Sequence, residues 1–129
     1  MIQNNNNNHN YKFIDLFAGT GAFSYALEKN NKFECVFAND MVKSSKQIYE
    51  LNNPTHSFTL QDLNTINVDN IPSHNILCGG FPCQPFSIAG NKKGFEDKRS
   101  NVFWKIVEIL EKHKRSKNDR CVQDWCVQE

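Results

Sequence analysis

One cysteine in this sequence stands in a setting that suits a nucleophile. Cys83 lies between Pro82 and Pro85 and follows the pair Gly79-Gly80. Each proline fixes its own φ and biases the residue before it away from helix, so the thiol sits on a stiff loop. The apolar run Ile76–Cys78 before the glycines predicts a buried strand, and ligands of open α/β sheets bind just past the strand ends. A buried structural cysteine is the common alternative, but a packed core needs no such backbone control around one thiol.

A glycine-containing turn is the second candidate for chemistry. Residues 12–17 (KFIDLF) predict a strand that runs directly into Gly19, Thr20 and Gly21, and apolar residues at helical spacing follow as far as Asn30-Asn31. A strand, a glycine turn and a helix open a nucleotide-binding βα unit, in which the backbone can approach a ligand closely. A tight βα turn without any ligand explains the same pattern equally well.

Two acidic residues follow the next two predicted strands. Asp40 comes at the end of a strand that begins at Phe33, about twenty residues after the glycine turn, where a carboxylate suits ribose hydroxyls. Asp62 follows a short strand over residues 57–60. Each carboxylate also has a purely structural alternative. Asp40 precedes a helix and can be its N-cap, and Asp62 can be a turn former.

Helical segments separate the predicted strands. The second helix spans about residues 42–51 with Ile48 and Leu51 on its apolar side, and a last helix spans about residues 102–113. Residues 63–72 suggest a loop with a helical turn. Because strands alternate with helical segments, we expect an α/β fold, a Rossmann-like parallel sheet with right-handed crossovers and flanking helices.

Composition narrows the class of protein. The 129 residues fit one domain or part of one, and the net charge is only +1. Residues 1–90 carry five Lys/Arg and seven Asp/Glu, whereas residues 91–129 carry ten and seven. This distribution is a mild hint of a polyanion partner near the C-terminal part, and a solvated helix face explains it equally well. The five cysteines are scattered and form neither a disulfide framework nor a zinc pattern. With no signal peptide and no long apolar run, we expect an intracellular protein that needs no membrane, cytoplasmic in a bacterium or phage and nuclear in a eukaryote.

These motifs together resemble a known family. The strand and glycine turn (FIDLFAGTG, residues 13–21), the cysteine loop (GFPCQPFS, residues 80–87) and the segment GFEDKR (residues 94–99) are similar to motifs of DNA (cytosine-5)-methyltransferases. The similarity runs from about Lys12 to His113. The Pro-Cys-Gln block with its flanks is highly specific, whereas the glycine turn alone is not.

The resemblance implies a reaction and a set of roles. The family transfers a methyl group from S-adenosylmethionine to carbon 5 of a flipped cytosine in double-stranded DNA, and Cys83 would attack carbon 6 as a thiolate while Pro82 orients the base. The resemblance further implies cofactor contacts from Phe17, Gly19, Thr20, Gly21, Asp40 and Asp62. It implies DNA contacts from Gln84, Ser87 and Arg99.

The sequence also departs from the family pattern. No Glu-Asn-Val motif follows the last helix, and the target-recognition segment is missing. We therefore expect a disordered Asn-rich tail over residues 1–11, a truncated catalytic domain over residues 12–113 and an unmatched tail over residues 114–129. The alternatives are a non-catalytic fragment that binds S-adenosylmethionine, one subunit of a split enzyme completed by a C-terminal fragment, and, least favoured, a Cys78/Cys83 metal or redox pair.

Overall fold

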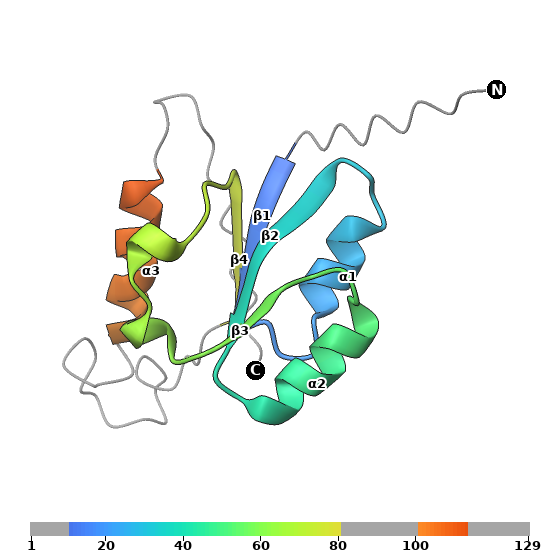
Figure 1. The fold of residues 1–129 in the computed structure, drawn as a ribbon. Coiled ribbons are helices and arrows are strands. Elements are labelled where there is room, and N and C mark those ends of the chain that lie inside the picture. Colours follow the sequence, from blue (N-terminus) through green and yellow to red (C-terminus); the bar gives the residue numbers. More distant parts are fainter. Residues whose placement is uncertain (1–10, 81–100, 114–129) are drawn as a thin grey trace, which may run out of the picture.

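The computed structural model describes residues 11–80 and 101–113, which form a four-stranded sheet with helices on both faces (Figure 1). The elements in chain order are β1 (Tyr11–Leu16), α1 (Ala22–Glu28), β2 (Phe33–Asp40), α2 (Lys43–Asn52), β3 (Phe58–Leu60), the 3₁₀ turns η1 (Leu63–Thr65) and η2 (Val68–Asn70), β4 (Ile76–Gly79) and α3 (Asn101–Lys112).

All described strand pairs are parallel, and the strand order is β3-β2-β1-β4. The chain moves outward from β1 through β2 to β3 and then crosses back to place β4 on the other side of β1. The order therefore reverses between β1 and β4, and ligands of such sheets bind where it reverses, at the carboxyl ends of the strands. Those ends lie at the bottom of the sheet in Figure 1.

The two faces of the sheet bury different side chains. On the α3 face, Ile14 and Leu16 of β1 pack with a cluster from the 3₁₀ turns and the helix: Leu63, Ile66, Val68, Ile71, Ile106 and Ile109. On the α1 and α2 face, Tyr49 packs with Ala18, Ala38 and Phe58. The apolar residues between β3 and β4 thus contribute to the core.

An irregularity in β2 serves this two-sided core. The pairing with β1 shifts register between Phe13 and Ile14, so that Phe13 lies opposite Cys35 and Ile14 opposite Phe37. Strict alternation would send Val36 and Phe37 to opposite faces. With one extra residue in the strand, both pack on the α3-face cluster, while Cys35 packs on the other.

The predicted parallel sheet is confirmed, with most boundaries within two residues. β1 begins at Tyr11, one residue inside the segment that we assigned to the N-terminal tail. The predicted apolar side of α2 is wrong: Ile48 and Leu51 are 44% and 81% exposed, and the buried residue is Tyr49. Among the described residues, no helix is long and apolar enough to cross a membrane.

Candidate functional site

The turn after β1 has an unusual backbone. Phe17, Gly19 and Gly21 all have positive φ, at 54°, 55° and 84°. Positive φ is ordinary for glycine, but for a bulky residue such as Phe17 it is strained, and such strain is frequent at ligand sites. Backbone hydrogen bonds hold the turn, from the N–H of Ala18 to the carbonyl of Asn39 and from the N–H of Gly21 to the carbonyl of Ala18.

The two glycines of this turn have different surroundings. A Cβ on Gly21 would lie 2.6 Å from the ring of Tyr49 and 2.6 Å from the side chain of Asn53, so Gly21 lets α1 pack closely on α2. Among the described residues, a Cβ on Gly19 would meet only the carbonyl of Phe17, at 3.9 Å. The space beside Gly19 is therefore open to a ligand, whereas that beside Gly21 is filled by protein.

Asp40 lies against the glycine turn. Its Oδ2 accepts a hydrogen bond from the N–H of Gly19 at 2.9 Å, and its Oδ1 accepts from the N–H groups of Met41 at 2.7 Å and Val42 at 3.1 Å. A carboxylate offers about four acceptor positions. The described residues thus use three of these positions, which leaves about one on Oδ2 that they do not fill. The N-cap of α2 is Val42, so Asp40 does not take the capping role that we considered for it.

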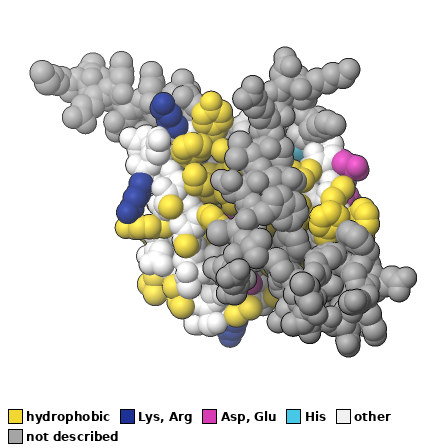
Figure 2. All heavy atoms as spheres, turned by 180° about the vertical axis from the view of Figure 1, so that it is seen from behind, with side chains coloured by type: hydrophobic (Ala, Val, Ile, Leu, Met, Phe, Trp, Pro, Cys, Tyr) yellow, Lys and Arg dark blue, Asp and Glu magenta, His cyan; other side chains and the backbone are white. Residues whose placement is uncertain are grey.

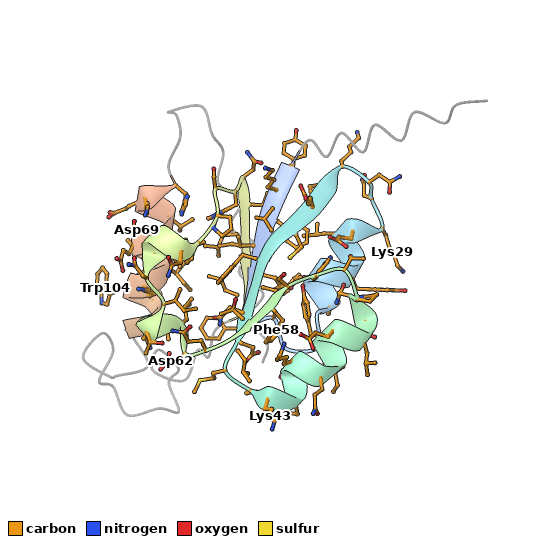
Figure 3. All side chains as sticks on the ribbon, in the orientation of Figure 1. Lys29, Lys43, Phe58, Asp62, Asp69 and Trp104 are labelled. Carbon is orange, nitrogen blue, oxygen red and sulfur yellow. The ribbon has the colours of Figure 1, made fainter. Side chains whose placement is uncertain are left out.

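Asp62 is exposed and accepts a hydrogen bond from the N–H of Asn64 as the N-cap of η1. This is the turn-forming role considered above, and it leaves Oδ2 of the carboxylate with no hydrogen bond within the described part of the chain. Figure 3 shows Asp62 at the carboxyl-end edge of the sheet, where β3 runs into the 3₁₀ turns.

Two further features at this edge were not predicted from the sequence. The buried amide of Asn39 donates to the carbonyls of Thr59 and Gln61, and so fixes the end of β3 against β2. Met41 and Leu60, which follow or end these two strands, are 64% and 41% exposed. Apolar side chains thus stand exposed next to the Asp40 carboxylate, and their place directly beside an acidic strand end was the one available signal.

Beneath the turn lies a buried carboxyl. Asp15 is fully buried on β1, and its Oδ2 accepts a hydrogen bond from the hydroxyl of Ser24 at 2.6 Å. Burial raises the pKa of Asp15 from 3.8 to about 6, and the hydrogen bonds from Ser24 lower it only in part. Because Ser24 lies in the first turn of α1, this bond bridges the two ends of the glycine turn.

The structure brings together some of the residues singled out from the sequence. Phe17, Gly19, Thr20, Gly21 and Asp40 lie in or against one turn, and Thr20 accepts a hydrogen bond from Asn52 through its carbonyl. Asp62 lies two strands away from the turn, beyond β2. The remaining predicted site residues, Pro82, Cys83, Gln84, Ser87 and Arg99, lie outside the described residues.

The described part of the chain reaches Gly80, directly after β4. β4 pairs with β1, with Gly79 opposite Leu16, so the chain leaves the sheet next to the glycine turn and enters the segment that holds Cys83. Within residues 11–80 and 101–113, no group of three or more His, Cys, Asp or Glu side chains could hold a metal ion. The Cys78/Cys83 pair is untested, because Cys83 is not among them.

Comparison with known proteins gives a consistent result. The model of the C-5 cytosine-specific DNA methylases matches residues 11–116. The type II methyltransferase M.HhaI of Haemophilus parahaemolyticus is 46% identical over 103 residues, which cover 80% of this chain and 31% of that protein. M.NgoBI of Neisseria gonorrhoeae is 47% identical over 102 residues, 78% of this chain and again 31% of the relative. The chain thus spans about a third of the length of the curated relatives it matches.

Solved structures share the fold. The Dnmt2 methyltransferase of S. pombe is 27% identical with a TM-score of 0.64, over 81% of this chain and 33% of that one. A mutant DNMT2 of Spodoptera frugiperda is 24% identical with a TM-score of 0.60, over 78% of this chain and 31% of that one, and supports the fold alone. The Rossmann-like fold predicted from the sequence is confirmed.

Proposed function

The chain belongs to the C-5 cytosine-specific DNA methylase family, and we propose that it transfers a methyl group from S-adenosylmethionine to carbon 5 of a flipped cytosine in double-stranded DNA. The observation that carries the proposal is the convergence of three strand ends. The glycine turn after β1, Asp40 at the end of β2 and the exit of β4 toward Cys83 all lie at one edge of the sheet, where its strand order reverses.

The residues at this edge fit S-adenosylmethionine. The open side of Gly19 gives a ligand access to the turn, and Asp40 keeps about one acceptor position for a ribose hydroxyl. Phe17 and the exposed Met41 offer apolar surface for adenine, while Asp62 offers an acceptor for its amino group. When bound, the cofactor supplies an electrophilic methyl group.

Cys83 would act on the base. Its thiolate forms a bond to carbon 6 of the cytosine, which places electron density on carbon 5 for the methyl transfer. Loss of the proton from carbon 5 and cleavage of the bond between sulfur and carbon 6 then restore the aromatic ring and free Cys83. Pro82 would orient the base, Gln84 and Ser87 would face the DNA, and Arg99 would contact phosphate.

A second candidate follows from the length of the chain relative to its relatives. Because the chain spans 31% of M.HhaI, it could bind S-adenosylmethionine without acting on DNA, or act as one subunit that a C-terminal fragment completes. The cofactor residues of the described part favour at least the binding function. We place either form inside the cell, where its substrate DNA is.

Trapping on DNA that contains 5-fluorocytosine separates these functions. Fluorine on carbon 5 prevents the proton loss, so a catalytic Cys83 should remain covalently bound to the DNA in the presence of S-adenosylmethionine. We expect an adduct with the chain alone or with an added C-terminal fragment of M.HhaI, and none with Cys83→Ser. Cofactor binding by calorimetry with no adduct under either condition would reject the transferase and retain the binding function.

A further inference from the structure

A chain of buried polar side chains runs from the glycine turn to the far end of α2. The hydroxyl of Ser24 donates to Oδ2 of Asp15 at 2.6 Å, and the phenol of Tyr49 donates to Ser24 at 2.8 Å. Nδ1 of His56 lies 2.8 Å from the same phenol oxygen. The four groups come from β1, α1, α2 and the connection to β3, so the chain joins all the elements on this face of the sheet.

Counting hydrogens allows two arrangements of these bonds, and the first has Ser24 as the donor to Asp15. Each hydroxyl has one proton, so Ser24 that donates to Asp15 must accept from Tyr49, and Tyr49 must then accept from a protonated Nδ1 of His56. Nε2 of His56 lies 2.5 Å from Oε2 of Glu28 but makes no hydrogen bond among the described residues, and so close a pair is an attractive ion pair only when the imidazole is protonated. In this arrangement His56 is an imidazolium, and both Asp15 and Glu28 are carboxylates.

The same contacts also fit the opposite direction. A protonated Asp15 donates to Ser24, Ser24 donates to Tyr49, and Tyr49 donates to a bare Nδ1 of His56, while Nε2 keeps its proton toward Glu28. One bond from hydrogen to Nδ1 of His56 is broken and one to Oδ2 of Asp15 is formed, with the two hydroxyls each passing one proton on. The number of protons and the net charge are equal in the two arrangements.

Burial makes the second arrangement accessible. Oδ1 of Asp15 is buried and has no hydrogen-bond partner within residues 11–80 and 101–113, and an anion with one unsatisfied oxygen in the core is costly. A neutral Asp15 avoids that cost, in keeping with its raised pKa. Burial also raises the pKa of Tyr49, so the phenol keeps a proton that it can pass along the chain.

We propose that Asp15, Ser24, Tyr49 and His56 form a relay that shares one proton between the Asp15 carboxyl and the His56 imidazole, and that His56 is through this relay a positioning residue for the turn of residues 17–21. The relay ends on the Asp15–Ser24 bond that bridges this turn. The protonation state of His56, which lies beside Glu28, therefore affects the Asp15–Ser24 bond and with it the turn. No relay residue needs to contact a ligand for this effect.

Other titratable groups around the relay define its surroundings. Asp40 acts on Asp15 through its charge, and Cys78 on β4 lies opposite Asp15 in the strand pairing. The thiol of Cys35 lies 3.6 Å from the phenol oxygen of Tyr49. Burial raises the pKa of this thiol, so Cys35 stays neutral and adds no charge to the relay. The remaining neighbouring charges are the ion-paired Lys46 and Glu50 on α2, with Lys46 near the ring of Phe58.

Nuclear magnetic resonance of the full chain tests the relay without S-adenosylmethionine or DNA, so its result is independent of the proposed function. Two groups that share a proton titrate together, and each reports both midpoints of the pair. We expect Cγ of Asp15, Nδ1 of His56 and the amide of Gly21 to follow one two-step curve against pH. Independent single steps in the unaltered protein would reject the relay, and a Gly21 amide that does not move would reject its link to the turn.

Variants separate the relay from simple attraction between charges. Tyr49→Phe keeps the ring in the core but cannot pass a proton, and Ser24→Ala breaks the relay at a second point. In either variant, Asp15 and His56 should each follow a single step. Tyr25→Phe, at a 53% exposed tyrosine of α1, is the matched control and should keep the two-step curve. Two-step curves that persist in either relay variant would reject the proposal. If Tyr49→Phe does not fold, the result for Ser24→Ala alone tests the relay.

Discussion

At the scale of single residues, Asp15 is the most informative side chain of the described region. It is fully buried, and its carboxyl has a pKa of about 6 in the folded protein against 3.8 for an ordinary Asp. The folded state therefore holds the proton more tightly than the unfolded state does. The stability that this preference contributes is complete below about pH 4 and is lost as the pH rises to about 6.

Replacing the carboxyl should remove this dependence. The free energy of unfolding of the unaltered protein, relative to Asp15→Asn, should fall by up to about 3 kcal/mol between pH 4 and pH 7. Urea unfolding of both proteins across this range measures the difference. Glu111→Gln, at an exposed residue of α3, controls for the loss of one carboxylate and should give a flat difference. A flat difference for Asp15→Asn as well would show that Asp15 titrates in its ordinary range.

Asp40 carries the prediction about the ligand. Since about one acceptor position remains on its carboxylate, removal of one ribose hydroxyl from S-adenosylhomocysteine should weaken binding about tenfold, as expected for one hydrogen bond to a charged group. In Asp40→Ala the intact and deoxy ligands should bind equally. Calorimetry with the 2′-deoxy and 3′-deoxy ligands measures both ratios. Discrimination that survives in Asp40→Ala would assign the ribose contact to another residue.

At the scale of elements, the βα turn predicts an order of glycine substitutions. Gly80→Ala should change stability by less than about 0.5 kcal/mol, because none of the described residues lies within 4 Å of its Cβ. Gly19→Ala should cost about 1–2 kcal/mol for its positive φ alone. Gly21→Ala adds the overlap with Tyr49 and Asn53, about 1–3 kcal/mol more. Urea unfolding measures the loss of unfolding free energy for all three variants. If Gly21→Ala loses no more than Gly19→Ala, α2 can shift to make room for the added methyl group.

The elements also show what the sequence could and could not predict. Alternation of apolar runs with turn residues was enough for the parallel sheet, and the order of the motifs placed Gly19 and Asp40 at one edge. The orientation of α2 was not predictable, because its few apolar residues do not define one face. It is settled by the phenol of Tyr49, which bonds Ser24 and contacts His56, and by its ring, which packs on Phe58 at 4.9 Å. These partners lie outside α2, and no local pattern of the helix reveals them.

At the scale of the whole molecule, the described surface combines exposed apolar side chains with a net charge of the chain of only +1. Eight large hydrophobic side chains of the described residues are substantially exposed: Tyr11, Tyr25, Met41, Val42, Ile48, Leu51, Leu60 and Trp104. Figure 2 shows hydrophobic side chains interspersed with polar atoms on the described part of one face, and in Figure 3 Trp104 points away from the sheet. Exposed apolar area together with low net charge favours association.

The outward side of α2 tests this expectation. Changing Ile48 and Leu51 together to Lys removes two side chains that are 44% and 81% exposed and raises the net charge to +3. Light scattering of concentrated solutions should fall, while the free energy of unfolding should stay within about 0.5 kcal/mol, because neither side chain supports the core. Gln47→Lys, at an exposed position of the same helix, adds charge without removing apolar area and should reduce scattering less. If Gln47→Lys lowers the scattering as much as the double change does, charge rather than apolar contact controls association. If the double change unfolds the chain, the side of α2 that carries Ile48 and Leu51 is buried in solution.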